Sequence, residues 1–338
     1  MMLTPFNTTQ CHSATIHFIL PCLMGIFYAV GFLLNSLSLW VFGSHVKNWN
    51  CGTVLQFNLA LTDIVLTPMV PFMVLYLQQD DWPYGQFLCQ LKACLLSIQM
   101  YGSICFLTLI SIHRYMTVVH RASKPCFADK SFIKRLCLGV WVGLLLQGLP
   151  FFVILKTSEI DNSTKCLSIH QSDMSVIYFS YNVAILLFGL IVPFSMCVVC
   201  YSCLSVFMSK VKICSLKGQM MKAKSTQVIT VCLLIFTICY IPVHVTRTIG
   251  VTIKLFFPFH CGLLERTEVM YYISFTLSSI NCCLDPLLYC FASKHFRESF
   301  QSFLTAARCP SPGSHCLKLL RNYDPNISVN TAESVQMN

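Results

Sequence analysis

Charged side chains are scarce in this chain, and that scarcity decides its class. Asp, Glu, Lys and Arg together make up 11% of the 338 residues, whereas 55% are hydrophobic. A soluble domain carries roughly 25% charged residues. The mean hydropathy of +0.66 points the same way. The composition therefore excludes an ordinary soluble protein and predicts a protein of the membrane.

The sequence signatures of several functions are also missing. The chain has no internal repeat, no Gly-rich phosphate loop and no His or Cys pair at metal-ligand spacing. A transporter built on inverted repeats and a membrane enzyme with a nucleophile or metal cluster are therefore disfavoured. Nucleic-acid binding is excluded as well, because the net charge of +10 forms no soluble basic face. We expect neither an enzyme nor a nucleic-acid partner.

Apolar segments long enough to cross a membrane dominate what is present. A span needs about 20 mostly apolar residues to cross roughly 30 Å of hydrocarbon. Seven segments qualify: 16–43, 51–77, 89–119, 136–155, 175–208, 226–251 and 267–291. The predicted fold is an all-α membrane protein, a seven-transmembrane helix bundle over residues 16–291.

Basic residues give the predicted orientation, because short cytoplasmic loops are enriched in Lys and Arg. With the N-terminus outside, 17 of the 23 Lys and Arg lie on the cytoplasmic side. We expect a multi-pass plasma-membrane protein with an extracellular segment at 1–15 and no cleaved signal peptide. A short amphipathic helix is predicted at 292–300, at the inner membrane face, followed by a disordered cytoplasmic tail at 301–338.

Four cysteines fall on the predicted outer side, where disulfides persist. They are Cys11, Cys89, Cys166 and Cys261. We predict the pairs Cys89 with Cys166 and Cys11 with Cys261, although the sequence alone permits three pairings.

Other modifications are predicted from short motifs. Asn7 and Asn162 begin glycosylation sequons on the predicted outer side, so both are expected to carry glycans. Cys309 and Cys316 follow the amphipathic stretch and are candidates for palmitoylation. Free cytosolic thiols are an equal alternative for these two cysteines.

Two carboxylates, Asp63 and Asp285, lie inside apolar spans. An ionised side chain at bilayer depth costs several kcal/mol unless protein or trapped water solvates it. The pair therefore predicts a polar interior that the protein uses.

Each span carries a motif of its own. In chain order these are Asn35; Asn58-Leu59-Ala60-Leu61-Thr62-Asp63; Ser111-Ile112-His113-Arg114-Tyr115; Trp141; Pro193 and Tyr201; Phe236 with Cys239-Tyr240-Ile241-Pro242; and Asn281 with Asp285-Pro286-Leu287-Leu288-Tyr289. Together they resemble the rhodopsin-like, or class A, G protein-coupled receptors. The resemblance extends from the first span to Phe300.

The resemblance implies a set of switch residues. Pro193, Pro242 and Pro286 interrupt membrane helices and create bends, and in the family the sixth span swings about such a bend. Arg114 ends a span at the cytoplasmic edge, where its guanidinium can reach water in one state and turn inward in another. His113 stands where the family usually has an acid, so the usual partner of this Arg is missing. The implied switch residues are Arg114, Tyr115, Tyr201, Phe236, Tyr240, Pro242, Asp285, Pro286 and Tyr289.

The family also has a central polar cluster that can hold a sodium ion. The matching residues here are Asp63, Ser103, Asn281 and Asp285, with Asn35 beside them. Without a cation the two acids must be hydrogen-bonded or protonated. Apart from this ion, no cofactor is expected.

A ligand site is predicted one turn beyond the Pro242 bend, where His244 and Arg247 share a helix face. An Arg that faces the cavity suits phosphate or carboxylate. The pattern is similar to the sixth span of the purinergic nucleotide receptors of the delta branch. The candidate ligand-binding residues are His244, Arg247, Tyr101, Lys92, Phe275 and Tyr271. The alternative for Arg247 is an ion pair with Glu265 or Glu268 at the mouth.

The chain departs from the nucleotide receptors at some anchors. Those receptors usually add an Arg in the outer third span and another in the outer seventh, where this chain has Ala93 and Phe275, and Ser97 replaces an aromatic residue. A triphosphate carries up to about four charges, which one Arg and one His hardly balance. The main hypothesis is a receptor for an extracellular anionic small molecule, a nucleotide or related phosphate compound. A lysophospholipid or a small carboxylate is the alternative ligand.

The receptor hypothesis brings its partners with it. They are a heterotrimeric G protein, arrestin and receptor kinases. A retinal-type opsin is excluded, because the seventh span has no Lys between Ile273 and Leu284.

Overall fold

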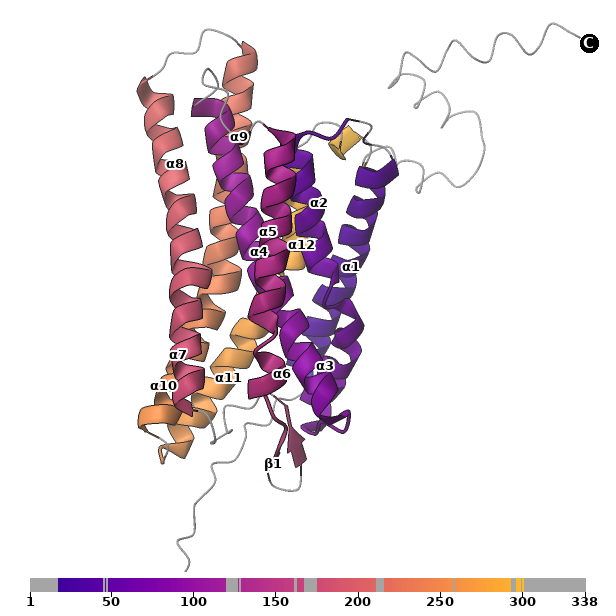
Figure 1. The fold of residues 1–338 in the computed structure, drawn as a ribbon, viewed down its shortest axis with the longest axis vertical. Helices are drawn as coiled ribbons and strands as arrows, with labels where there is room; N and C mark the ends of the chain where they lie inside the picture. The colour runs from indigo at the N-terminus through magenta and orange to yellow at the C-terminus, as the bar shows by residue number, and fades with distance from the viewer. Residues whose placement is uncertain are drawn as a thin grey trace, which may run out of the picture.

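Helices that lie side by side along one long axis make up the fold (Figure 1). The structure is a computed structural model, and it describes residues 18–44, 46, 48–119, 127, 129–160, 163–166, 175–210, 216–257, 259–292, 296–298 and 300. Within these ranges the only sheet is a hairpin of β1 (Ser158–Ile160) and β2 (Ser163–Lys165). We call the end of the bundle that carries this sheet the hairpin end.

Six membrane spans in the described residues are single helices or helices joined end to end, each long and apolar enough to cross a bilayer. In chain order they are α1 (Ile19–Ser44); α2 (Cys51–Ile64) with η1 (Thr67–Met69) and α3 (Val70–Gln79); α4 (Gly85–Val119); α5 (Lys130–Gly148) with α6 (Phe151–Ile154); α7 (Ser175–Ala184) with η4 (Ile185–Ile191) and α8 (Val192–Lys210); and α9 (Leu216–Ile235) with η5 (Phe236–Tyr240) and α10 (Ile241–Phe256).

The seventh crossing differs from the continuous helix that the sequence predicts. It consists of α11 (Cys261–Ser278) and α12 (Asn281–Ala292), separated by Ser279 and Ile280. The hydroxyl groups of Ser278 and Ser279 donate to carbonyls three residues earlier, at 2.7 and 2.6 Å. Such side-chain bonds compete with the helical ladder. For this reason neither helix reaches the length of a span by itself, and both are needed to complete the bundle.

Pro286 removes a second backbone bond inside α12. Proline has no N–H to donate to the carbonyl four residues earlier, which here belongs to Cys282. The Asn35 side chain on α1 fills the gap, because its Nδ2 donates to that carbonyl at 2.7 Å. The bend predicted at Pro286 is therefore also a contact point between the first and last spans.

The other two predicted proline positions follow loosened helical turns. The π-helical segment η4 ends just before Pro193, and η5 ends just before Pro242. A proline ring clashes with the carbonyl four residues back, and a wider turn relieves that clash. The second span has a comparable irregularity at η1, next to Pro68 and Pro71, that the sequence analysis did not predict.

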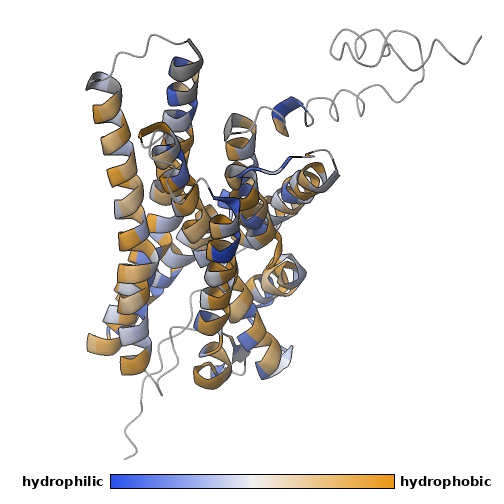
Figure 2. Ribbon diagram, turned by 45° about the horizontal axis from the view of Figure 1, so that its top comes forward, coloured by the Kyte–Doolittle hydropathy of each residue, from blue (hydrophilic) through white to orange (hydrophobic). Residues whose placement is uncertain are grey.

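Helix α4 is the centre of the bundle. In its most apolar stretch 78% of residues are buried, against 17% for the span that begins with α5. Figure 2 shows hydrophobic residues along the outer sides of the helices over most of their length. Polar bonds tie the periphery to the centre, as where Trp141 of α5 donates to Asn58 of α2 at 2.8 Å. The interior is the polar part, as an aqueous cavity or a signalling hub in a membrane requires.

The predicted disulfide between Cys89 and Cys166 is confirmed and holds the hairpin against the start of α4. Three further contacts fasten the same strands. The Trp82 N–H donates to the Thr164 carbonyl at 2.9 Å, the Thr164 N–H donates to Asp81, and Lys165 pairs with Asp80 at 2.6 Å. The hairpin is therefore a fixed rim of the bundle.

Several predictions fall outside the described residues. Cys261 is disulfide-bonded, but its predicted partner Cys11 is not described. The same holds for residues 1–15 and 301–338, and for Asn7, Asn162, Cys309 and Cys316. Of the amphipathic helix predicted at 292–300, Phe296 is buried, with its ring 5.0 Å from Phe42 and 5.7 Å from Tyr289.

The close approach of α1 and α12 gives a test of the fold. A Cβ added at Gly31 would lie 2.3 Å from the sulfur of Cys282 and 2.9 Å from its Cβ, whereas one at Gly43 meets nothing within 4 Å. Gly31→Ala should destabilise the receptor by about 1–3 kcal/mol through overpacking. Gly43→Ala, on the same helix, should be neutral or slightly stabilising. Thermal melting of the purified receptor in detergent measures both, and equal melting temperatures would contradict the packing.

Candidate functional site

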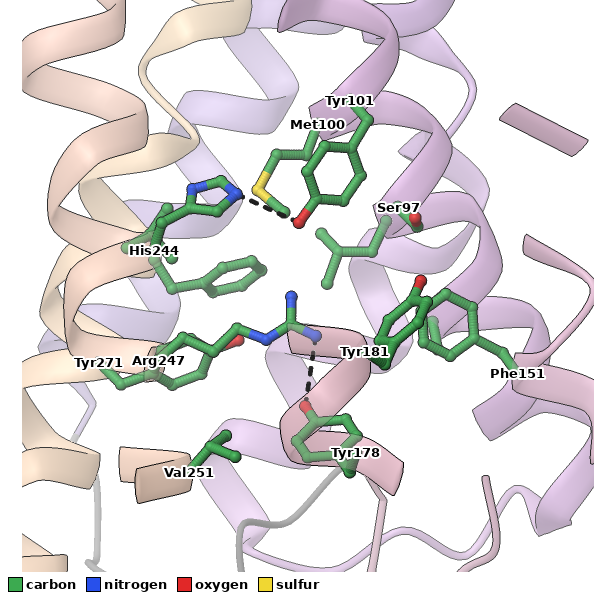
Figure 3. A pocket seen from close by; sticks show the side chains of 14 residues that line it. Ser97, Met100, Tyr101, Phe151, Tyr178, Tyr181, His244, Arg247, Val251 and Tyr271 are labelled. Atoms are coloured by element: carbon green, nitrogen blue, oxygen red, sulfur yellow. Dashed lines mark hydrogen bonds between the residues drawn. The ribbon is translucent and has the colours of Figure 1, made fainter. Parts of the chain in front are cut away.

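A pocket opens inside the bundle toward the hairpin end, bounded by α4, α6, α7, α10 and α11 (Figure 3). Its volume is about 740 Å³, part of which is open to solvent. The lining residues are Ala93, Leu96, Ser97, Met100, Tyr101, Phe151, Tyr178, Tyr181, Val243, His244, Arg247, Val251, Tyr271 and Phe275. Aromatic and aliphatic side chains form most of this wall, as in ligand sites generally.

Five of the six candidate ligand-binding residues are brought together here: Tyr101, His244, Arg247, Tyr271 and Phe275. They come from three spans that are far apart in the sequence. The rings of Tyr271 and Phe275, one helical turn apart on α11, are stacked with centroids 6.1 Å apart. The helical spacing that suggested each residue therefore points it to a common space.

Lys92 is the exception. Its Nζ lies 4.8 Å from the centre of the Tyr76 ring and 4.6 Å from that of Trp82, between α3 and α4. Adjacent residues on an α-helix point in directions about 100° apart, so Lys92 turns away from the pocket while Ala93 faces it. This cation is held by two aromatic faces, and its position gives no support to the predicted ligand contact.

Arg247 is the charged group of the pocket lining, and its guanidinium extends into the middle of the space (Figure 3). Nη2 donates to the Tyr178 hydroxyl at 3.3 Å, and the guanidinium lies 5.7 Å from the centre of the same ring. No carboxylate is among the described lining residues, and Arg247 forms no ion pair with Glu265 or Glu268 in the described chain. The positive charge therefore faces the pocket with phenol groups as its neighbours.

Sequence reasoning missed Tyr178, Tyr181 and Phe151. The two tyrosines stand three positions apart at the start of the fifth span, which puts them on one face of α7. That spacing was a usable signal. Phe151 carried no comparable signal, because it faces the pocket from a four-residue helix that begins after Pro150.

His244 connects the pocket to the deeper part of the bundle. Its Nδ1 lies 2.8 Å from the Tyr240 carbonyl, and its Nε2 lies 3.1 Å from the Tyr101 hydroxyl. A carbonyl only accepts, so Nδ1 carries the proton and donates. In the neutral ring Nε2 is then the acceptor for Tyr101. The two bonds fix both the tautomer and the orientation of the imidazole.

Below His244, Tyr240 reaches the acid cluster. Its hydroxyl donates to Ser103 at 2.7 Å, and the Ser103 hydroxyl donates to Oδ2 of Asp285 at 3.2 Å. All three side chains are at least 99% buried. Tyr101, His244, Tyr240, Ser103 and Asp285 thus form a continuous series of hydrogen-bonded residues from the pocket to the carboxylates.

The acid cluster has oxygens that the protein leaves without partners. Both carboxylate oxygens of Asp63 and Oδ1 of Asp285 are buried and accept no hydrogen bond from the described residues. Asn281 is held nearby, because Gln99 donates to it and it donates to Ser103, both at 3.4 Å. Buried acceptors in such a site suit a hard cation with oxygen ligands, as predicted from the sequence. No group of three or more His, Cys, Asp or Glu occurs in the described part, so the oxygens of Ser and Asn would have to complete the site.

The remaining switch residues lie at the end of the bundle opposite the hairpin. Tyr115, next to Arg114 near the end of α4, packs with Tyr201 against the buried cluster of Val118, Cys200, Leu204 and Ile229. Tyr289 donates to Asn35 at 3.4 Å, and its ring lies 5.5 Å from Phe42. Phe236 contacts Tyr240 with ring centroids 5.9 Å apart. The predicted switch positions therefore follow one interior line from the pocket to Arg114.

Comparison with known proteins agrees with this arrangement. Residues 34–289 match the family described as 7 transmembrane receptor (rhodopsin family). The chain is 31% identical to purinoceptor 4 of Rattus norvegicus over 318 residues, covering 92% of this chain and 86% of that protein. It is 28% identical to purinoceptor 3 of Gallus gallus over 314 residues, covering 92% and 96%. It is 29% identical to purinoceptor 2 of Rattus norvegicus over 309 residues, covering 91% and 82%.

The family match spans more than half of the chain, and the relatives align over nearly all of it. The apolar spans agree with a multi-pass protein of the plasma membrane. The chain therefore belongs to the rhodopsin family of seven-transmembrane receptors, in the group of the purinoceptors, and is a receptor and not an enzyme.

Proposed function

We propose that this receptor is activated by an extracellular anionic small molecule, a nucleotide or a related phosphate compound, and signals through a heterotrimeric G protein. The observation that carries the proposal is Arg247, whose guanidinium faces the pocket without a carboxylate partner in the described lining. The names of the purinoceptor relatives support the same ligand class. The hairpin end is then the extracellular face, in agreement with the excess of Lys and Arg predicted at the other end.

The pocket divides into two parts that suit such a ligand. Arg247 can donate two parallel hydrogen bonds to a phosphate or carboxylate, and the Tyr178 hydroxyl beside it can add a third. The stacked rings of Tyr271 and Phe275 form a flat wall for a planar or apolar group. In this proposal the ligand's anionic group lies at α10 and its body lies against α11.

A second ligand class is favoured by the low charge of the wall. Arg247 is the cationic side chain of the described lining apart from the buried His244, while a triphosphate carries up to about four negative charges. Leu96, Met100 and Val251 would suit an acyl chain. A lysophospholipid or a small carboxylate is therefore the alternative to a nucleotide at the same Arg247 anchor.

Transmission follows the hydrogen-bonded series of residues described above. A ligand that moves α10 at Arg247 also moves His244, which lies three residues earlier on the same face. His244 is bonded to the turn that precedes Pro242, where η5 is already loosened. We place a sodium ion between Asp63 and Asp285, where it would neutralise the buried carboxylates. Arg114 is the contact point for the G protein, and arrestin and receptor kinases act on the segment at 301–338.

Loss of Arg247 should remove most of the ligand response. Arg247→Ala should lower the potency of the active compound by at least about 30-fold, because truncating one partner of a buried charge pair costs 2–5 kcal/mol. Arg247→Lys should restore part of it, and Lys254→Ala, on the same helix, serves as the matched control. The measurement is a G protein activation assay in cells, run with nucleoside di- and triphosphates, succinate and lysophosphatidate. A nucleotide that acts equally on Arg247→Ala, or an amine as the active compound, would contradict the proposal.

Arg114 should separate signalling from binding. In Arg114→Ala, G protein activation should be lost, while binding of the same compound changes by less than about threefold, because the pocket lies at the other end of α4. The exposed Arg135 of α5 gives a control for loss of a positive charge at this end. Radioligand binding and nucleotide exchange on the G protein measure the two effects. Loss of binding with intact coupling would disprove the assignment.

The cation site can be tested without any agonist. Sodium chloride, compared with choline chloride, should raise the melting temperature of the wild-type receptor, because an ion that binds only the folded state stabilises it by mass action. The effect should persist in Arg247→Ala and disappear in Asp63→Asn. Equal stabilisation of Asp63→Asn would show that sodium binds elsewhere.

A further inference from the structure

The hydroxyl group of Ser103 has all its hydrogen-bonding capacity in use. A serine hydroxyl has one donor hydrogen and two acceptor lone pairs. Ser103 donates to Asp285 at 3.2 Å and accepts from the Tyr240 hydroxyl at 2.7 Å and from Asn281 Nδ2 at 3.4 Å. The residue is fully buried. No lone pair of Ser103 is therefore left for a cation in this arrangement.

This saturation distinguishes Ser103 from the two acids beside it. Asp63 and Asp285 keep three buried oxygens without hydrogen bonds from the described residues. A cation can bind those oxygens with the protein as it stands. To add Ser103 as a further ligand, the receptor must first release one of the two donors, and the shorter bond is the one from Tyr240.

We propose that the Tyr240 hydroxyl and the cation compete for the oxygen of Ser103, so that Tyr240 is a positioning residue that sets the affinity of the cation site. While Tyr240 donates to Ser103, the cation has one ligand fewer and binds more weakly. When the Tyr240 ring turns away, Ser103 becomes available and the cation is held more tightly.

Tyr240 is placed where the ligand pocket can influence this competition. Its carbonyl accepts the Nδ1–H of His244, a residue of the pocket wall that is also bonded to Tyr101. Its ring contacts Phe236, and Phe236 contacts Phe194 of α8, both with centroids 5.9 Å apart. Tyr240 also ends η5, whose backbone is wider than an α-helix. A change at His244 therefore reaches the Ser103 bond through one residue.

The test is the sodium dependence of thermal stability in purified receptor, titrated with sodium chloride at constant ionic strength with choline chloride. Tyr240→Phe keeps the ring and removes the donor. It should lower the sodium concentration that gives half of the maximal stabilisation by about fivefold, the effect of one hydrogen bond of ordinary net strength. If Tyr240→Phe expresses poorly, Tyr240→Met, which also lacks the hydroxyl, should shift sodium in the same direction.

A double-mutant comparison separates the hydroxyl from any effect of ring packing. In a Ser103→Ala background, Tyr240→Phe should leave the sodium dependence unchanged. In a Ser111→Ala background the fivefold shift should remain, because Ser111 is a buried serine of the same helix whose hydroxyl donates to its own Leu107 carbonyl at 2.9 Å.

Three results would overturn the proposal: unchanged or weaker sodium binding in Tyr240→Phe, a shift that persists without Ser103, and no sodium effect in either wild type or Tyr240→Phe. The inference rests on the cation proposed between the two acids, and not on the agonist. Because no agonist is added, an error in the ligand class leaves the outcome unaffected, and Asp63→Asn identifies an error in the cation site.

Discussion

No water is available inside a bilayer to hydrogen-bond a peptide group or a carboxylate, so each polar atom in the spans depends on a partner from the protein. This constraint explains the helices, which satisfy their own backbone, and also the places where they deviate. The carbonyl that Pro286 leaves without a backbone donor is bonded by Asn35 of the first span. Polar side chains are likewise confined to the interior, where Ser103 and Asp285 reach partners on other helices.

The spans and their interior motifs could be predicted because the membrane imposes a simple pattern. Apolar length identifies a crossing, and a charged or amide side chain within it has to face inward. The division of the last crossing could not be predicted in the same way. Serine hydroxyls that bond their own backbone at Ser278 and Ser279 occur in continuous helices as well. Whether the helix breaks depends on the neighbouring spans, which the local sequence does not contain.

The pocket shows the same limit at the scale of one residue. His244 and Arg247 were assigned to one face by their spacing, and the Pro242 bend set their depth. Lys92 was uncertain because a shift of one position turns a side chain by about 100°. In the structure Lys92 lies over aromatic rings instead. Tyr178 and Tyr181 had the right spacing, but only the packing of α7 beside α10 makes that face a pocket wall.

The contact between α1 and α12 has a consequence for how motion is distributed. At Gly31 the two helices are too close to admit even a methyl group, and the Asn35 bond fixes their relative height. The sixth span has no such restraint at η5, where the backbone is wound more loosely. The bundle thus has a stationary side and a compliant side. Displacement caused by a ligand is directed to the compliant side, since the stationary helices serve as the frame against which it is measured.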